Sequence, residues 1–197
     1  MNKYVKRAIL TATIMIVVII VIISTFFIVR YVENKNKINT VMEIYSNSII
    51  QDRIQDNDEN AIINVKDALL QIDGEMALGI ITIDKIKYKG IVYEGTETTT
   101  LAKGVGHFEH SPYLIGNVCI AGHNYISVWD KLYTLRPGDN ITYISFLGTK
   151  TYQVSSIQEI NETDWDMLQD TEDNRITLIT CVNSKPNKRL CVQGIER

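Results

Sequence analysis

A run of 22 residues without a charged side chain, Ala8 to Val29, lies near the start of the chain and constrains its organisation more than any other feature. As a helix with a rise of about 1.5 Å per residue, the run is roughly 33 Å long, which matches a hydrocarbon core about 30 Å thick. The apolar region of a cleaved signal peptide is shorter, at about 7 to 15 residues, and no A-x-A-like cleavage site accompanies this run. We therefore expect residues 1–30 to form a short stub and an uncleaved transmembrane signal anchor, the chain's single membrane span.

Basic residues flank this run on both sides. Three precede it in a tight cluster that the free N-terminus reinforces, and three follow it, diluted by Glu33. The six are Lys3, Lys6 and Arg7 before the run, and Arg30, Lys35 and Lys37 after it. Positive charge near a span favours the cytoplasmic side, so we expect a cytoplasmic N-terminus and a body outside the cell.

The composition of the chain excludes several classes of protein. Beyond residue 30, 16 of the 20 basic residues remain against all 23 acidic ones, a net charge of −7. A weakly acidic chain lacks the clustered Lys and Arg that bind phosphate backbones, so we expect no nucleic-acid partner. A hydrophobic fraction of 45% with only 3 Pro and 11 Gly excludes a disordered chain, because enough apolar surface exists to offset the entropy of folding.

Residues 31–75 carry apolar side chains at helical spacing. Two amphipathic helices are predicted, separated by a polar stretch at residues 51–60. Their apolar positions are Ile38, Val41, Tyr45 and Ile49 in one helix, and Ile62, Val65, Leu69 and Ile72 in the other. We expect a helical juxtamembrane stalk, which either is a solvated spacer or packs against the body and regulates it.

Residues 76–197 have the pattern of an all-β domain. Short runs rich in Ile, Val, Thr and Tyr are typical of strands, and seven of them in about 120 residues favour a closed barrel or a sandwich. The predicted strands span residues 79–86, 89–93, 117–121, 139–145, 150–156, 176–181 and 190–194. Helical structure is predicted only at 129–135 and as a turn at 163–168, where Thr163 is a candidate cap.

The three cysteines differ in their surroundings. An odd number excludes full disulfide pairing, so at least one thiol is free or intermolecular. Cys181 ends an apolar strand and precedes a polar loop, a position that presents the thiol at a barrel rim. Cys119 and Cys191 lie inside apolar runs and are predicted to be small buried hydrophobic residues.

A histidine and an arginine are also predicted to lie at strand ends near Cys181. His123 ends a second apolar strand, next to Gly122, and Arg189 begins the last strand eight residues after Cys181. An antiparallel return of that strand would place Arg189 beside the thiol. A thiolate, a proton-transferring imidazole and a fixed cation are sufficient for acyl transfer through a covalent intermediate.

His107, Glu109 and His110 are the only other group that suggests a site. Two histidines three residues apart in a loop, without further ligands nearby, are a poor metal centre, so we expect solvated loop residues and no metal. The sequence also gives no indication of a cofactor.

The motifs around these residues resemble the sortases, cysteine transpeptidases that attach surface proteins to the cell envelope of Gram-positive bacteria. The segments TLITC at 177–181, AGHN at 121–124 and KRLCV, which contains Arg189, match in order and spacing. LAKGVGHF at 101–108 and LRPGDNI at 135–141 add to the match, which covers most of residues 79–192.

The resemblance implies an eight-stranded barrel that cleaves a sorting signal of the Leu-Pro-x-Thr-Gly kind after its Thr. Cys181 would be the nucleophile, His123 the general acid and base, and Arg189 the partner of the oxyanion or substrate backbone. Thr180, Ala121 and Asn124 would contribute to substrate binding. The implied partners are surface proteins with a C-terminal sorting signal, and a peptidoglycan precursor or another amine that accepts the acyl group.

Within the family, a compact class D enzyme is the expected match, because no long insertion precedes the cysteine strand. Class B is next, since Asn124 after His123 resembles that class more closely.

The alternative to an enzyme is a catalytically silent, membrane-tethered binding module on the same barrel. A papain-like or caspase-like hydrolase is disfavoured because Cys181 follows His123 and lacks the caspase motif.

Overall fold

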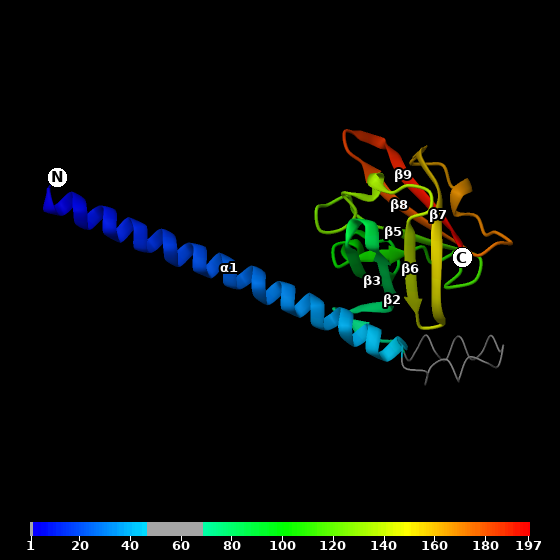
Figure 1. Cartoon of the computed structure of the whole chain (residues 1–197), viewed down its shortest axis with the longest axis horizontal. Coiled ribbons are helices and arrows are strands. Elements are labelled where there is room, and N and C mark those ends of the chain that lie inside the picture. The colour runs from blue at the N-terminus through cyan, green and yellow to red at the C-terminus, as the bar shows by residue number, and fades with distance from the viewer. Residues whose placement is uncertain (1, 47–68) are drawn as a thin grey trace. The chain divides into compact units, whose positions relative to one another are not determined.

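The computed structural model describes residues 2–46 and 69–197, which form two compact units that divide after Asn39. The first unit is helical and the second is built mainly from strands (Figure 1). The predicted boundaries at residues 30 and 75 stay predictions, and most of the second stalk helix lies outside the described residues. Its last residues, Gln71–Ile72, form the short strand β1 instead of a helix.

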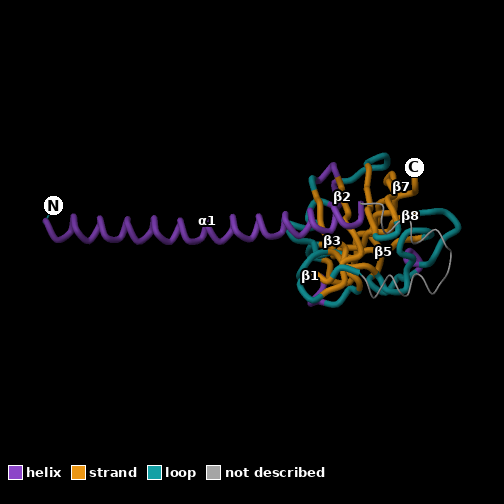
Figure 2. Tube along the Cα trace, turned by 90° about the horizontal axis from the view of Figure 1, so that it is seen from below, coloured by secondary structure: helices purple, strands orange, loops and turns teal. Residues whose placement is uncertain are grey.

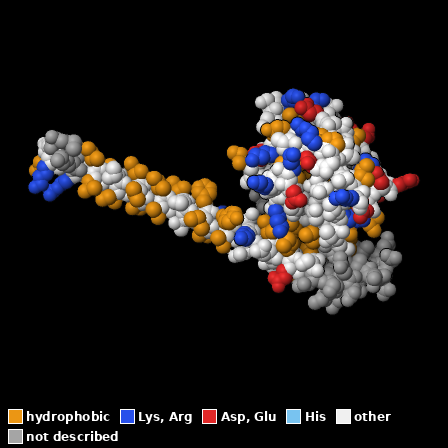
Figure 3. Space-filling view, viewed as in Figure 1, with side chains coloured by type: hydrophobic (Ala, Val, Ile, Leu, Met, Phe, Trp, Pro, Cys, Tyr) orange, Lys and Arg blue, Asp and Glu red, His pale blue; other side chains and the backbone are white. Residues whose placement is uncertain are grey.

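The first unit consists of most of helix α1, Lys3–Ser46. Hydrophobic side chains cover the helix along much of its length (Figure 3), and an 18-residue stretch with a mean hydropathy of 3.1 makes it long and apolar enough to cross a membrane. Thr25 donates its hydroxyl hydrogen to the carbonyl of Val21 at 2.7 Å, and Ser24 donates to Ile20. These polar groups are therefore satisfied inside the helix, as a lipid environment requires.

The end of α1 belongs to the second unit. Val41 and Tyr45 are buried, and the Tyr45 hydroxyl donates to the carbonyl oxygen of Ala77 in β2. The first predicted amphipathic helix is thus the last part of α1. It is continuous with the apolar span, since no helix-breaking residue separates the two.

The second unit is a closed barrel of eight strands, as the resemblance implies. Around the barrel the order is β2-β3-β4-β5-β8-β9-β7-β6, and β6 pairs with β2 to close it. All neighbours are antiparallel except the parallel pairs β3–β4 and β5–β8. Figure 2 shows the strands curling around one another. Their bounds are β2 Glu75–Ile83, β3 Tyr88–Glu94, β4 Val105–His107, β5 Asn117–Ala121, β6 Asn140–Ser145, β7 Gly148–Asn161, β8 Arg175–Val182 and β9 Lys185–Glu196.

Short helices interrupt the connections between strands. They are η1 Asp84–Ile86, α4 Thr98–Leu101, η2 Leu132–Thr134 and η3 Asp166–Leu168. The helix predicted at 129–135 is therefore a single 3-10 turn. Thr163 is not a cap: η3 begins after Trp165, and no side chain caps it.

The interior of the barrel is filled by alternate residues of each strand. In β8, Ile176 and Leu178 point into the main core with Val118 and Ile120 of β5. Because strand residues alternate between faces, Thr177, Ile179 and Cys181 lie on the outer face of β8.

The connection between β7 and β8, residues 162–174, covers part of this outer face. Ile179 and Cys191 pack there against Met167 and Leu168 of the connection. The fully buried Asn117 donates its amide hydrogens to the carbonyls of Met167, at 3.0 Å, and Gln169, at 2.8 Å. Strand β5 and most of β8 are therefore covered on both faces, which explains why apolar residues occur on both faces of these strands.

All seven predicted strands are present, and the bounds of β5 match the prediction. The prediction missed β1 and β4, which are only two and three residues long. The prediction placed the start of β9 at residue 190 instead of Lys185, because the proline within Lys185–Lys188 is typical of a turn.

We predict that Asn117→Ala destabilises the barrel and loosens the 162–174 connection. The change removes the two hydrogen bonds that the Asn117 side-chain amide donates to backbone carbonyls. It also removes the oxygen that accepts the Thr177 hydroxyl at 2.7 Å, and so leaves buried polar groups unpaired. Each such group costs about 1 to 3 kcal/mol, so the melting temperature should fall by roughly 6 °C or more. Thermal unfolding followed by near-ultraviolet circular dichroism measures this. Asn187→Ala, which truncates an exposed side chain, is the control, and equal melting temperatures for both variants would contradict the prediction.

Candidate active site

The end of β8 carries Cys181 at the surface. Its side chain is exposed, whereas the strand residues before it are buried. Cys181 pairs with Arg189 and Val182 pairs with Lys185, so the ladder shifts register between these pairs. Residues 186–188 bulge from β9 at this point, and only Asn183 and Ser184 form the turn. A bulge of this kind redirects side chains next to a functional group.

Arg189 lies directly opposite Cys181 on the neighbouring strand, as the sequence predicts. Its guanidinium group is held by three acceptors: the carbonyl oxygens of Pro186, at 2.7 Å, and Lys188, at 2.9 Å, and the carboxylate of Glu162, at 2.9 Å. Arg189 therefore lies on the same face of the sheet as Cys181, while its N–H groups are bound by Pro186, Lys188 and Glu162.

His123 follows β5 on a tightly packed segment. A Cβ atom on Gly122 would lie 2.6 Å from the Trp129 ring, so only glycine allows this close approach. The backbone N–H of Trp129 donates to the carbonyl oxygen of His123 at 3.2 Å. The imidazole stacks on Tyr125, with ring centroids 4.7 Å apart. The orientation of His123 is thus fixed from its backbone and from one face of its ring.

Two of the predicted substrate-binding residues hold the site together. Thr180 is buried and donates its hydroxyl hydrogen to the carbonyl of Gly122 at 2.7 Å, which ties β8 to the histidine segment. Asn124 donates its amide hydrogens to the carbonyl of Cys181 at 3.0 Å and to the side-chain oxygen of Asn183 at 3.1 Å. Both hydrogen bonds of Asn124 connect the histidine segment to the end of β8 that carries Cys181.

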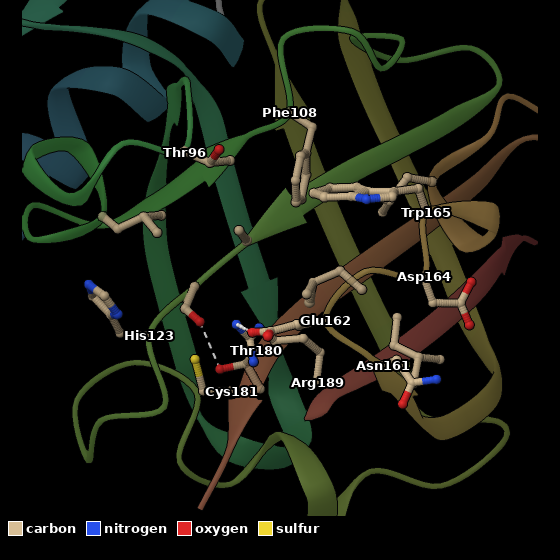
Figure 4. A pocket seen from close by; sticks show the side chains of 16 residues that line it. Thr96, Phe108, His123, Asn161, Glu162, Asp164, Trp165, Thr180, Cys181 and Arg189 are labelled. Carbon is tan, nitrogen blue, oxygen red and sulfur yellow. Dashed lines mark hydrogen bonds and ion pairs between the residues drawn. The ribbon is translucent and has the colours of Figure 1, made fainter. Parts of the chain in front are cut away.

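A pocket of about 280 Å³ opens beside the cysteine, and we call it the first pocket. His123, Cys181 and Arg189 lie at one end of it, and Phe108 and Trp165 lie close together at the other (Figure 4). The remaining lining is largely apolar and includes the predicted Ala121, with Leu101, Ile160, Leu168 and Ile179. An extended apolar peptide segment with a polar bond at the cysteine end fits such a lining.

The other two cysteines are buried, as predicted. Burial raises the pKa of the Cys119 thiol and of the Cys191 thiol to about 12, so both stay protonated at neutral pH. Because the thiolate is the reactive form, neither is a nucleophile in the folded protein. Cys181 is the one exposed thiol in the chain.

His107 is not the solvated loop residue that the sequence suggests. It is fully buried in β4, where its Nδ1 forms a hydrogen bond with the carboxylate of Glu94 at 3.2 Å. Its Nε2 lies 2.9 Å from the Ser111 hydroxyl and 3.1 Å from the carbonyl oxygen of Pro112. The Ser111 oxygen in turn accepts the backbone N–H of Cys119 at 3.1 Å. These bonds fasten the loop after β4 to β5. Among residues 2–46 and 69–197, no cluster of three His, Cys, Asp or Glu side chains could hold a metal ion.

Sequence reasoning missed the contributions of the 162–174 connection. Glu162 contacts Arg189, and Trp165 forms the far wall of the first pocket, although its side chain is 58% exposed. A tryptophan in a polar stretch after a predicted strand is the one signal that could have pointed to this wall. The contact of Glu162 with Arg189, 27 positions later, leaves no pattern in the sequence.

Comparison with known proteins matches residues 81–196 to the Sortase domain model. The chain is 27% identical to sortase A of Bacillus anthracis over 128 residues, which cover 62% of this chain and 61% of that protein. It is 30% identical to sortase D of Bacillus subtilis over 108 residues, covering 53% of this chain and 54% of that protein. The chain thus spans less than two thirds of the length of either relative, and the relatives' names do not resolve one class.

Solved structures share the same barrel. Sortase A of Listeria monocytogenes superposes with a TM-score of 0.58 at 27% identity, over 61% of this chain and 87% of that one. The Clostridium perfringens sortase D5 transpeptidase superposes with a TM-score of 0.64 over 83% of this chain and 98% of that one, and at 22% identity it supports the fold alone. Because more than half of the residues match the Sortase domain and those residues form the closed barrel, the chain belongs to the sortase family of cysteine transpeptidases.

Proposed function

We propose that this chain is a membrane-anchored transpeptidase that cleaves a Leu-Pro-x-Thr-Gly-like sorting signal after Thr and transfers the acyl group to an amine of a cell-wall precursor. One observation carries the proposal: the chain's single exposed thiol lies at the end of an apolar pocket that it shares with an imidazole and a guanidinium group. The substrates are surface proteins with a C-terminal signal. The apolar lining of the first pocket fits the Leu-Pro part of that signal.

The reaction proceeds in two steps with the residues of this site. The Cys181 sulfur attacks the Thr carbonyl carbon, the peptide C–N bond breaks, and His123 delivers the thiol proton to the leaving amine of Gly. The resulting thioester is then attacked by the acceptor amine, and the thiol is regenerated. Arg189 donates to the carbonyl oxygen as negative charge develops on it.

Arg189 must change partners to act in this way. In the structure, Glu162 accepts one of its terminal N–H groups, and two backbone carbonyls accept from the other terminal nitrogen. We propose that the substrate carbonyl replaces the Glu162 carboxylate during binding. The ion pair is partly exposed, with 27% of the Arg189 and 42% of the Glu162 side chain accessible, so its exchange costs little.

The remaining features of the proposal concern placement and class. We propose that the N-terminus is cytoplasmic and the barrel extracellular, on the charge bias around the apolar helix. We also propose a class D enzyme, with class B next, because the connection before β8 contains only the three-residue helix η3.

We predict that Cys181 alone forms a covalent adduct. The full chain in detergent, incubated with Leu-Pro-x-Thr-Gly-like peptides, should gain the mass of the N-terminal acyl fragment, and Cys181→Ala should gain none. Iodoacetamide should label the native protein once, because the thiols of Cys119 and Cys191 are buried with a raised pKa. Intact mass spectrometry measures both results.

The cysteine variants provide the control for this experiment. Cys119→Ser and Cys191→Ser should retain substantial adduct formation. A folded Cys119→Ser protein as inactive as Cys181→Ala would contradict the assignment of the nucleophile. A folded wild-type protein that neither cleaves nor acylates across the peptide panel would favour the silent binding module.

We predict that Glu162→Gln accelerates acylation at low signal-peptide concentration. The change removes the charge that competes for Arg189, and exposed ion pairs contribute up to about 1 kcal/mol, so the second-order acylation rate should rise about threefold to fivefold. Single-turnover kinetics measure this rate. Glu172→Gln, an exposed carboxylate in the same connection, is the matched control. A fall in the rate for Glu162→Gln would show instead that Glu162 positions Arg189 for catalysis.

A further inference from the structure

A second groove reaches Cys181 separately from the first pocket. It consists of two adjoining cavities of about 280 and 680 Å³, which share Asn124, Asp130, Tyr133 and Asn183. Cys181 and Thr180 line the inner cavity as well as the first pocket, so these two residues form the boundary between the two spaces. The nucleophile is therefore accessible to two ligands at once.

The second groove lacks the basic side chain that the first pocket contains. Its lining has no Lys or Arg, whereas the first pocket is lined by Arg189, by Glu162, which binds Arg189, and by Asp164. Of the second groove's two acidic residues, Glu159 is bound by Lys185 at 2.7 Å. Within residues 2–46 and 69–197, the Asp130 carboxylate has no hydrogen bond or ion pair. The groove therefore presents one uncompensated negative charge.

The polarity of the lining differs as well. The second groove is more polar than the first pocket, because Asn124, Asn183 and Asp130 line both of its cavities. Trp129, Val182 and Leu190 add apolar surface to the inner cavity. Tyr133, 64% exposed, adds an aromatic face to both cavities of the groove. A carboxylate beside an aromatic ring favours a cationic ligand that keeps part of its hydration.

The wall of the second groove is held in place by the backbone of the histidine segment. The N–H groups of Val128 and Asp130 both donate to the carbonyl of Tyr125, at 2.9 and 3.1 Å, and fix the turn that carries Asp130. Asn124 joins this turn to the carbonyl of Cys181. Asp130 and the nucleophile thus belong to one hydrogen-bonded unit, so a ligand of Asp130 has a defined position relative to the thioester.

We propose that the second groove binds the acceptor, a peptide with a primary amine, and that Asp130 attracts its ammonium form. This inference rests on the proposed function and names the site of its second substrate. The bound ammonium loses one proton to water, and the neutral amine attacks the thioester carbonyl. The C–N bond forms, the C–S bond breaks, and His123 transfers the second amine proton to the Cys181 sulfur. No oxidant or other reactant is needed.

The test separates acylation from amine capture. Full-length protein in detergent is supplied with a saturating signal peptide and increasing triglycine or Nα-acetyl-lysine amide, and hydrolysis and aminolysis products are quantified by mass spectrometry. Asp130→Asn should raise the KM for the preferred amine about fivefold, and Asp130→Lys more than tenfold. The single-turnover acylation rate of both variants should stay within twofold of wild type.

Two further measurements exclude a general effect of charge or folding. Asp84→Asn, which removes an exposed carboxylate in η1, should leave the KM for the amine unchanged. Tyr133→Lys should raise this KM, because it places a cation in the groove at an exposed position that tolerates substitution. Added salt should raise the KM of the wild type more than that of Asp130→Asn.

The outcomes distinguish this inference from the proposed function. Acylation of the wild type, with Asp130→Asn and Tyr133→Lys both showing an unchanged KM for the amine, would overturn the second groove as the acceptor site. Acylation followed only by hydrolysis with both amines would overturn it as well. A wild type that forms no acyl-enzyme would overturn the proposed function itself.

Discussion

The position of β8 between β5 and β9 is the constraint on which the site depends. Pairing with both neighbours fixes which residues of β8 face the barrel interior and which face outward. A slip of one residue would bury Cys181 and expose Leu178, at the cost of transferring a large apolar side chain to water. The burial of Ile176 and Leu178 therefore specifies that the thiol faces outward.

The same pairing places Arg189 beside the thiol, but electrostatics decide what Arg189 does there. A guanidinium group seeks oxygen acceptors wherever they lie, and Glu162 on the neighbouring connection supplies the nearest charged one. The site as it stands thus satisfies the cation in the absence of substrate, which avoids an uncompensated charge next to an apolar pocket. In the proposed mechanism, activation of the carbonyl depends on an exchange of acceptors that a partly exposed ion pair permits.

Short-range patterns in the sequence were sufficient to predict the strands that carry the site. Runs of β-forming residues located β5 and β8 and placed Cys181 at a strand end, and the antiparallel return of the next strand placed Arg189 beside it. Contacts between distant segments could not be predicted in this way. The burial of His107 depends on Glu94 and Ser111 converging on β4, a strand of three residues that is too short to show a period. The contact between Glu162 and Arg189, and the second groove around Asp130, likewise arise only when the barrel closes and brings separate loops together.

In the proposed reaction, two substrates must reach one thiol from different directions, and the first pocket and the second groove would provide the two approaches. While the acyl group occupies the first pocket, the amine must reach the thioester carbon from another direction, and water must not reach it more often than the amine does. A groove with a fixed negative charge raises the local concentration of a cationic acceptor over that of neutral water. Asn124 links the wall of this groove to the carbonyl of Cys181, so movement of one segment moves the other. With the acceptor in the second groove, as proposed, the side-chain amide of Asn124 would couple the binding of the acceptor to the position of Cys181.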